Sequence, residues 1–164
     1  MVAPRPVTPG QVVQTVAEGV SRLVSGRLTG VEREAQLDRL ASCYAERTDV
    51  RHPFAPSGDT PLRTRAELRA HFAAAGTATP GVERFVPVNM VVHQTTDPEV
   101  VVVEFAYAVS AGGRDVQVPC VFVVRVCDGV IVQSRDYADH VAMARAVGRL
   151  DALAASLLAD SARS

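Results

Sequence analysis

Two titratable side chains, His52 and Asp136, are the strongest candidates for chemistry in this sequence. His52 ends a short extended segment before Pro53, and histidine is the side chain whose ordinary pKa allows proton transfer near neutral pH. Asp136 lies in a β-rich run whose alternation puts it on one face with Ser134 and Ala138. An inward carboxylate needs a hydrogen bond, an ion pair or a proton. We therefore predict that Asp136 and His52 form an acid/base pair.

Such a pair could take a proton from the carbon next to a carbonyl and return it elsewhere, as isomerisation or aldol-type ring closure requires. Mutual attraction predicts a raised pKa for His52 and a lowered pKa for Asp136. The alternative is structural: Asp136 accepts hydrogen bonds from backbone or from Tyr107, and His52 only lines the loop before Pro53. Tyr107 is either a hydrogen-bond donor to a substrate or a buried tyrosine whose hydroxyl is satisfied.

Helical periodicity dominates the first half of the chain. A capping box at Thr8–Gln11 opens a helix that ends near Gly26, and a second helix is predicted over residues 31–45. A second capping box at Thr64 opens a short helix that closes at Gly76.

Strand periodicity follows, over residues 83–93, 100–110, 115–127 and 130–138, with short glycine turns typical of an antiparallel meander. Asp139 could cap one last helix that continues to Leu158. The predicted fold class is α+β, with a curved antiparallel sheet wrapped around N-terminal helices and an extra C-terminal helix.

Composition indicates one ordinary soluble domain of 164 residues. The predicted division is a flexible arm at 1–8, the main domain at 9–147, and the remaining helix and tail at 148–164. A formal net charge of -1 argues against nucleic-acid and membrane partners. Three cysteines without metal-like spacing indicate reduced thiols and a cytoplasmic location. The four histidines show no metal-ligand spacing either, so no metal is expected.

Two segments carry a resemblance to a known family: Y-A-E-R-T-D-V-R-H-P-F over residues 44–54 and D-G-V-I-V-Q-S-R-D-Y-A-D over residues 128–139. Together with the order of elements, they make residues 12–147 resemble the SnoaL-like, ketosteroid-isomerase-like branch of the nuclear-transport-factor-2-like superfamily. The resemblance implies a cone-shaped α+β fold that encloses an apolar pocket, no cofactor, and a homodimer.

Matched residue by residue, the chain departs from the best-known family patterns. His52 stands where the isomerases have an aspartate base, and Leu28 and Phe122 stand near the places of their oxyanion donors. This argues against steroid isomerisation of that type. Relatives that hydrolyse limonene epoxide use an Arg and an Asp where this chain has Phe105 and Tyr107. Asp136 matches a pocket aspartate of SnoaL-like cyclases most closely.

The resulting hypothesis is a cofactor-independent isomerase or cyclase that acts on an apolar, oxygenated small molecule, such as a polyketide- or terpenoid-like compound. Its catalytic residues would be Asp136, His52 and Tyr107. An epoxide-hydrolase-like enzyme, a non-catalytic binding protein and an interaction module remain alternatives. The residues expected to contact the ligand are Tyr44, Phe54, Phe72, Phe105, Cys120, Phe122 and Ser134.

Overall fold

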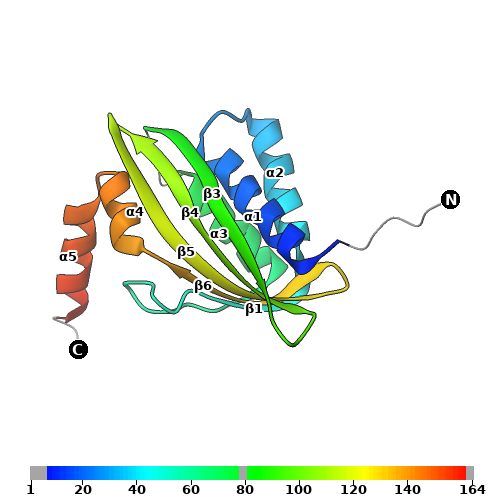
Figure 1. Cartoon of the computed structure of the whole chain (residues 1–164). Helices are drawn as coiled ribbons and strands as arrows, with labels where there is room; N and C mark the ends of the chain where they lie inside the picture. Colours follow the sequence, from blue (N-terminus) through cyan, green and yellow to red (C-terminus); the bar gives the residue numbers. More distant parts are fainter. Residues whose placement is uncertain (1–6, 78–80, 162–164) are drawn as a thin grey trace.

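A computed structural model describes residues 7–77 and 81–161 and has the α+β architecture that the sequence predicts (Figure 1). Among these residues, no helix is long and apolar enough to cross a membrane. The helices are α1 (Pro9–Val24), α2 (Gly30–Ser42), α3 (Arg65–Thr77), α4 (His140–Ala146) and α5 (Leu150–Ser161). The strands are β1 (Tyr44–Arg51), β2 (Leu62–Thr64), β3 (Val82–Gln94), β4 (Val100–Ala111), β5 (Arg114–Cys127) and β6 (Val130–Ala138).

The first helix begins at the capping box that the sequence predicts. The Thr8 hydroxyl accepts from the backbone N–H of Gln11, and the Gln11 side chain accepts from the backbone N–H of Thr8. Residues 1–6 of the predicted arm lie outside the described residues, and the predicted domain boundaries remain predictions. Gly19 lets α1 approach α2 closely, because a Cβ there would lie 2.6 Å from Cδ2 of Leu40.

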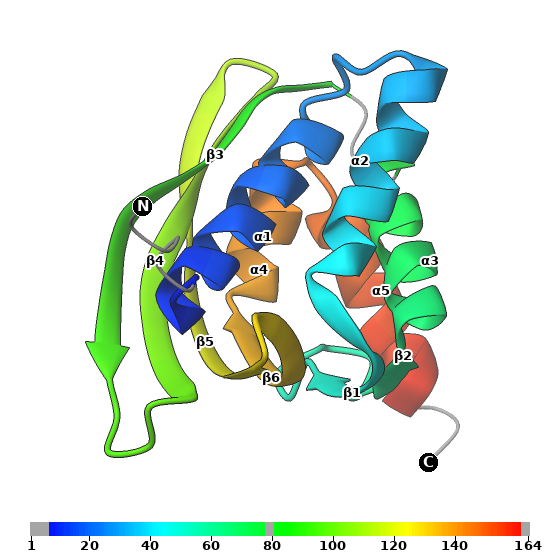
Figure 2. The same cartoon turned by 90° about the vertical axis from the view of Figure 1, so that its right-hand side faces the viewer.

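The sheet has six strands in the order β2-β1-β6-β5-β4-β3. The predicted antiparallel meander over β3–β6 is confirmed, and β1 pairs in parallel with β6. The β4–β5 and β5–β6 connections are tight turns whose central residues have positive φ. Helices α1, α2 and α3 cover one face of the curved sheet, while α4 and α5 lie at one end of it (Figures 1 and 2).

Two predicted helix boundaries are wrong. Helix α2 ends at Ser42 rather than near Ala45, so Tyr44 begins β1. The cause is tertiary: the backbone N–H of Ile131 donates a hydrogen bond of 2.8 Å to the carbonyl oxygen of Cys43, and this pairing extends the chain. The predicted single C-terminal helix is broken into α4 and α5 at Gly148, whose φ of +70° ends a helix.

The inner face of the sheet carries the core, as strand alternation predicts. Val103, Phe105, Tyr107 and Val109 of β4 are all buried, and β5 contributes Val118, Cys120 and Val124 on the same side. Helix α1 packs on β3, β4 and β5 and against α2 and α3. This packing closes one side of the concave face and leaves room at the end of the sheet near α4.

Candidate functional site

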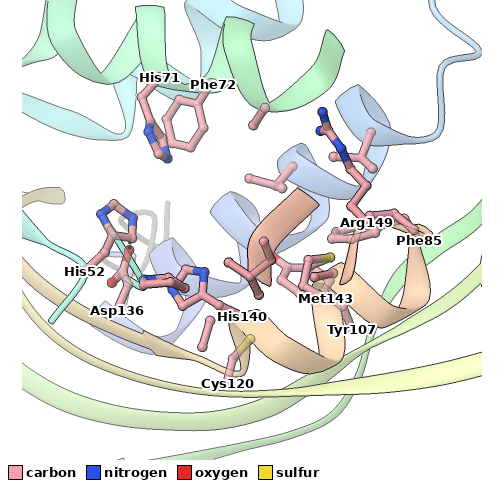
Figure 3. Close-up of a pocket in the computed structure, with 18 of the residues that line it drawn as sticks. His52, His71, Phe72, Phe85, Tyr107, Cys120, Asp136, His140, Met143 and Arg149 are labelled. Carbon is pink, nitrogen blue, oxygen red and sulfur yellow. Dashed lines mark ion pairs between the residues drawn. The ribbon is translucent and has the colours of Figure 1, made fainter. Parts of the chain in front are cut away.

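A cavity of about 520 Å³ lies between the concave face of the sheet and the helices around it. Helices α1 and α3 form one side, strands β3–β6 form the floor, and α4 and the start of α5 close the far end. Most of the lining side chains are apolar. Four polar side chains lie near one end, where Figure 3 shows His52, His71, Asp136 and His140 around the same space, whereas Arg149 lies toward the other end.

The parallel pairing of β1 and β6 brings His52 to Asp136. Val50 pairs with Ser134 and Arg51 pairs with Arg135. The residues that follow, His52 just after β1 and Asp136 in β6, therefore reach the cavity at the same level. Nε2 of His52 lies 3.8 Å from Oδ2 of Asp136 (Figure 3). This distance is too long for a direct hydrogen bond, and it leaves both side chains able to contact a third atom in the cavity.

Asp136 is a buried carboxyl group with one oxygen already engaged. The Ser134 hydroxyl donates to Oδ1, which leaves Oδ2 toward His52. Burial raises the pKa of Asp136 to about 7, although the Ser134 hydrogen bond and the charge of Arg135 act to lower it. Arg135 itself points to Asp49 on β1 and binds it at 2.6 Å. Asp136 therefore exchanges a proton near neutral pH.

His52 is neutral near pH 7. Its pKa is lowered to about 4, mainly by burial and also by the positive charges that His71 and His140 could carry, while Asp59 acts in the opposite direction. The predicted directions for this pair are therefore wrong: the pKa of Asp136 is raised and that of His52 is lowered. Loss of hydration outweighs mutual attraction. Asp136 is protonated at the low pH at which His52 becomes positively charged, so the two opposite charges do not coexist.

The loop after β1 holds His52 in place through Asp59. One carboxylate oxygen of Asp59 accepts from the backbone N–H of His52 at 2.9 Å, and the other lies 3.5 Å from Nη1 of Arg51. Arg51 also binds Asp49 at 2.9 Å. The backbone of His52 is thus fixed by polar contacts outside the cavity, while its ring faces inward beside His71, with ring centroids 5.0 Å apart.

Tyr107 lines the same cavity from β4, and Figure 3 shows it away from His52 and Asp136. Its ring stacks on Phe85 with centroids 4.3 Å apart. Burial raises the pKa of Tyr107, and nearby Cys120 and Asp136 add to the increase. The hydroxyl is therefore protonated and can donate to a ligand.

Four of the seven residues predicted to contact a ligand line the cavity, namely Tyr44, Phe72, Cys120 and Phe122. The thiol of Cys120 is protonated, since burial raises its pKa to about 12. Their roles as ligand contacts remain predictions.

The other three residues do not form the cavity wall. Phe54 is 68% exposed, because the turn after His52 directs it outward against Tyr137. Phe105 is buried behind the wall and packs edge-on against Tyr107 and Phe122. Ser134 supports Asp136 from within the core. Strand alternation shows which side chains point inward, but it does not show which of them reach the cavity and which lie behind other side chains.

Two further histidines line the cavity. His71 lies on α3 beside His52. His140, which drew no interpretation beyond its lack of metal-ligand spacing, begins α4. Its place directly after the capping residue Asp139, at the end of the strand that carries Asp136, was the available signal. Within the described part of the chain, no three His, Cys, Asp or Glu side chains are arranged to hold a metal ion.

Comparison with known families identifies the chain. The sequence profile of the SnoaL-like domain matches residues 25–134, about two-thirds of the sequence. The chain belongs to the SnoaL-like family. The fold of this SnoaL-like protein is the ketosteroid-isomerase-like fold of the nuclear-transport-factor-2-like superfamily. No curated protein matches the sequence.

Solved structures share the fold at low sequence identity. A candidate isomerase from Bacillus subtilis is 18% identical, with a TM-score of 0.60, covering 84% of this chain and 96% of its own. A candidate polyketide cyclase from Pseudomonas putida is 13% identical, with a TM-score of 0.62, and the match covers 85% of this chain and 98% of the cyclase. SalBIII, an epoxide hydrolase/cyclase-like enzyme with a role in pyran ring formation in the polyether salinomycin, is 18% identical, with a TM-score of 0.54. The match covers 79% of this chain and 92% of SalBIII. These identities establish the shared fold.

Proposed function

We propose that this SnoaL-like protein is a cofactor-independent isomerase or cyclase that moves a proton on an apolar, oxygenated substrate. The observation that supports this most is the Asp136 carboxyl group: it is buried in an apolar cavity, has a pKa of about 7, and leaves Oδ2 within 3.8 Å of His52. A general base works best when its pKa lies near the working pH. Asp136 meets that condition because burial weakens its ionised form.

In the proposed reaction, the ionised Asp136 removes a proton from the carbon next to a substrate carbonyl. The electrons of that C–H bond form an enolate, and the carboxyl group holds the proton. For isomerisation, Asp136 returns the proton to a different carbon of the same conjugated system. For ring closure, the enolate carbon attacks a second carbonyl carbon, and the new alkoxide oxygen takes the proton from Asp136. Both routes end with Asp136 ionised again.

His52 would bind the enolate oxygen as a neutral donor. Its pKa of about 4 keeps the imidazole uncharged at neutral pH, so one ring nitrogen carries a hydrogen that it can donate. Ser134 would hold Oδ1 of Asp136, so that Oδ2 is the oxygen that reacts. Tyr107 would donate a hydrogen bond to a more distant part of the substrate, because it lines the cavity away from the pair (Figure 3).

Polyketide- and terpenoid-like compounds are the proposed substrate class, since the wall is mainly apolar and fold relatives include candidate polyketide cyclases. A non-catalytic protein that binds such a compound is the second candidate, and the cavity of about 520 Å³ would suit it equally. Epoxide hydrolysis has less support, because Phe105 lies behind the wall and Tyr107 stands at the other expected polar position.

Proton exchange on a model ketone tests the proposal without knowledge of the natural substrate. β-Tetralone is an apolar bicyclic ketone, and exchange of its α-hydrogens in heavy water is followed by NMR. We expect the wild-type protein to accelerate this exchange, with a rate that rises with pH and levels off above about 7 as Asp136 ionises. Asp136→Asn should reduce the acceleration at least about a hundredfold.

The matched control is Asp128→Asn, which changes an exposed aspartate in the β5–β6 turn, where asparagine tolerates the positive φ of 50°. This variant should retain the wild-type rate. If the wild-type protein binds β-tetralone but gives no acceleration, the enzyme proposal fails and the binding-protein alternative remains. Equal rates in wild type and Asp136→Asn would also contradict the role of Asp136.

A further inference from the structure

His140 is a cavity residue whose position is fixed by the start of α4. The Asp139 side chain accepts from the backbone N–H of Ala142 at 2.8 Å and caps the helix. His140 is the next residue, so its side chain leaves the backbone at a defined angle toward the cavity that it lines. Figure 3 shows it on the same side of the cavity as Asp136.

One nitrogen of this histidine has no partner. Nε2 of His140 is buried and makes no hydrogen bond, and it is the one such side-chain nitrogen or oxygen among the residues whose burial is described, 7–75 and 81–159. Buried polar atoms in proteins are almost always hydrogen-bonded, because an unpaired one loses its hydration without compensation. An orphaned polar atom on the wall of a cavity is therefore a destabilising feature that a ligand could relieve.

The chemistry of His140 suits a neutral ligand oxygen. Burial lowers the pKa of His140, while Asp139 acts to raise it. Its ring is therefore an uncharged imidazole at neutral pH, with one nitrogen that donates and one that accepts. The capping bond to Ala142 already occupies an oxygen of Asp139. His140 also influences the pKa of His52, which places both rings within electrostatic range at the Asp136 end.

Nε2 is covered in the empty cavity, but the ring itself forms part of the wall. Rotation about the Cβ–Cγ bond exchanges the two edges of an imidazole ring. Such a rotation would put Nε2 where the carbon Cε1 now lies, without moving the helix. A ligand oxygen at that position would supply the hydrogen bond that the empty protein lacks.

We propose that His140 binds a second oxygen of the ligand, so that the cavity selects compounds with two oxygen substituents on one apolar skeleton. The first oxygen would lie at Asp136 and His52, and this part rests on the proposed function. The second would meet His140. A compound with one oxygen would leave Nε2 of His140 unpaired, which is the basis of the selection.

Binding of naphthols and dihydroxynaphthalenes tests this assignment directly. These fluorescent probes share one apolar skeleton and differ in the number of hydroxyl groups, and the protein has no tryptophan to interfere. We expect at least one dihydroxynaphthalene isomer to bind wild type roughly three- to tenfold more tightly than either naphthol, the increment of one hydrogen bond. His140→Phe and His140→Leu should abolish this difference, so that no dihydroxynaphthalene binds either variant more tightly than the naphthols do. His140→Gln should retain part of it.

Thermal unfolding provides a second measurement that needs no ligand. If Nε2 is unpaired, replacing the His140 ring by an apolar side chain should raise the melting temperature by about 2–4 °C. The control is His93→Phe, which changes an exposed histidine of β3 that binds Glu104 at 2.8 Å, away from the cavity. It should leave the selectivity between probes unchanged.

Each outcome bears on the assignment. Absence of any preference for dihydroxynaphthalenes in the wild-type protein, including absence of binding, would overturn it. So would a preference that persists in His140→Phe and His140→Leu, or a fall in melting temperature in both with selectivity retained. The proposed function is judged separately by exchange on β-tetralone. Selectivity that depends on His140 without such exchange would support His140 and reject catalysis by Asp136.

Discussion

Burial controls the protonation of Asp136 and His52, because each side chain loses more hydration than its neighbour restores. Asp136 has a pKa raised to about 7 and His52 a pKa lowered to about 4. Between these values both groups are neutral, and the contact of 3.8 Å is not an ion pair. The proposed chemistry needs this arrangement, since an ion pair would hold the carboxylate in place of a substrate.

Asp136→Asn tests the raised pKa through stability. In the unfolded chain Asp136 loses its proton above pH 3.8, whereas in the folded protein it keeps the proton up to about pH 7. The free energy of unfolding of the wild type therefore falls as pH rises from about 4 to 7. At about 1.4 kcal/mol per pKa unit, the total is at most about 4 kcal/mol. Asparagine carries no such penalty. The free energy of unfolding of Asp136→Asn minus that of wild type should therefore increase across this window in chemical denaturation.

His52→Gln should show the opposite profile. The unfolded chain binds a proton at His52 below 6.5, whereas the folded protein binds it only below about 4. Wild-type stability should therefore fall as pH decreases through this range, by up to about 3 kcal/mol. The difference between His52→Gln and wild type should grow toward low pH. Flat difference profiles for both variants would contradict the assigned pKa directions.

At the scale of elements, local signals predicted where most helices and strands lie. The capping boxes at Thr8 and Thr64 mark real helix starts, and strand alternation correctly places Tyr107 and Asp136 on the inner face. The end of α2 was mispredicted because the pairing of β1 with β6 depends on residues almost ninety positions away. Local sequence carries no information about such a partner.

Gly148 is the residue that separates α4 from α5. Its φ of +70° disfavours any residue with a Cβ, and an added Cβ would lie 3.3 Å from Nη2 of Arg114. We expect Gly148→Ala to lower the free energy of unfolding by about 1–2 kcal/mol.

Gly30→Ala is the matched control for this prediction. Gly30 begins α2 and an added Cβ there would meet nothing within 4 Å. Alanine is also the better helix former, so this variant should be neutral or slightly stabilising when the unfolding of both variants is measured by urea titration. Equal effects of the two substitutions would show that the break at Gly148 does not depend on its backbone conformation.

At the scale of the whole molecule, the outer face of the sheet bears on the predicted homodimer. Glu104 of β4 pairs with Val91 of β3 on one side and with Val121 of β5 on the other. Both valines are exposed. If this face joins two copies, Val121→Arg should shift the protein toward the monomer in light scattering coupled to size-exclusion chromatography. A wild-type protein that is already monomeric would contradict the predicted homodimer.

The sequence by itself determined the α+β class, the family, the alternation that turns Asp136 inward, and the short extended segment that leads to His52. Local periodicity and turn chemistry carry that information, because they depend on neighbours a few residues away. The tertiary structure decided which side chains meet. Parallel pairing of β1 with β6 brought His52 beside Asp136, burial reversed their expected pKa shifts, and the start of α4 added His140 to the wall. Desolvation and long-range register are properties of the packed molecule, and no local pattern encodes them.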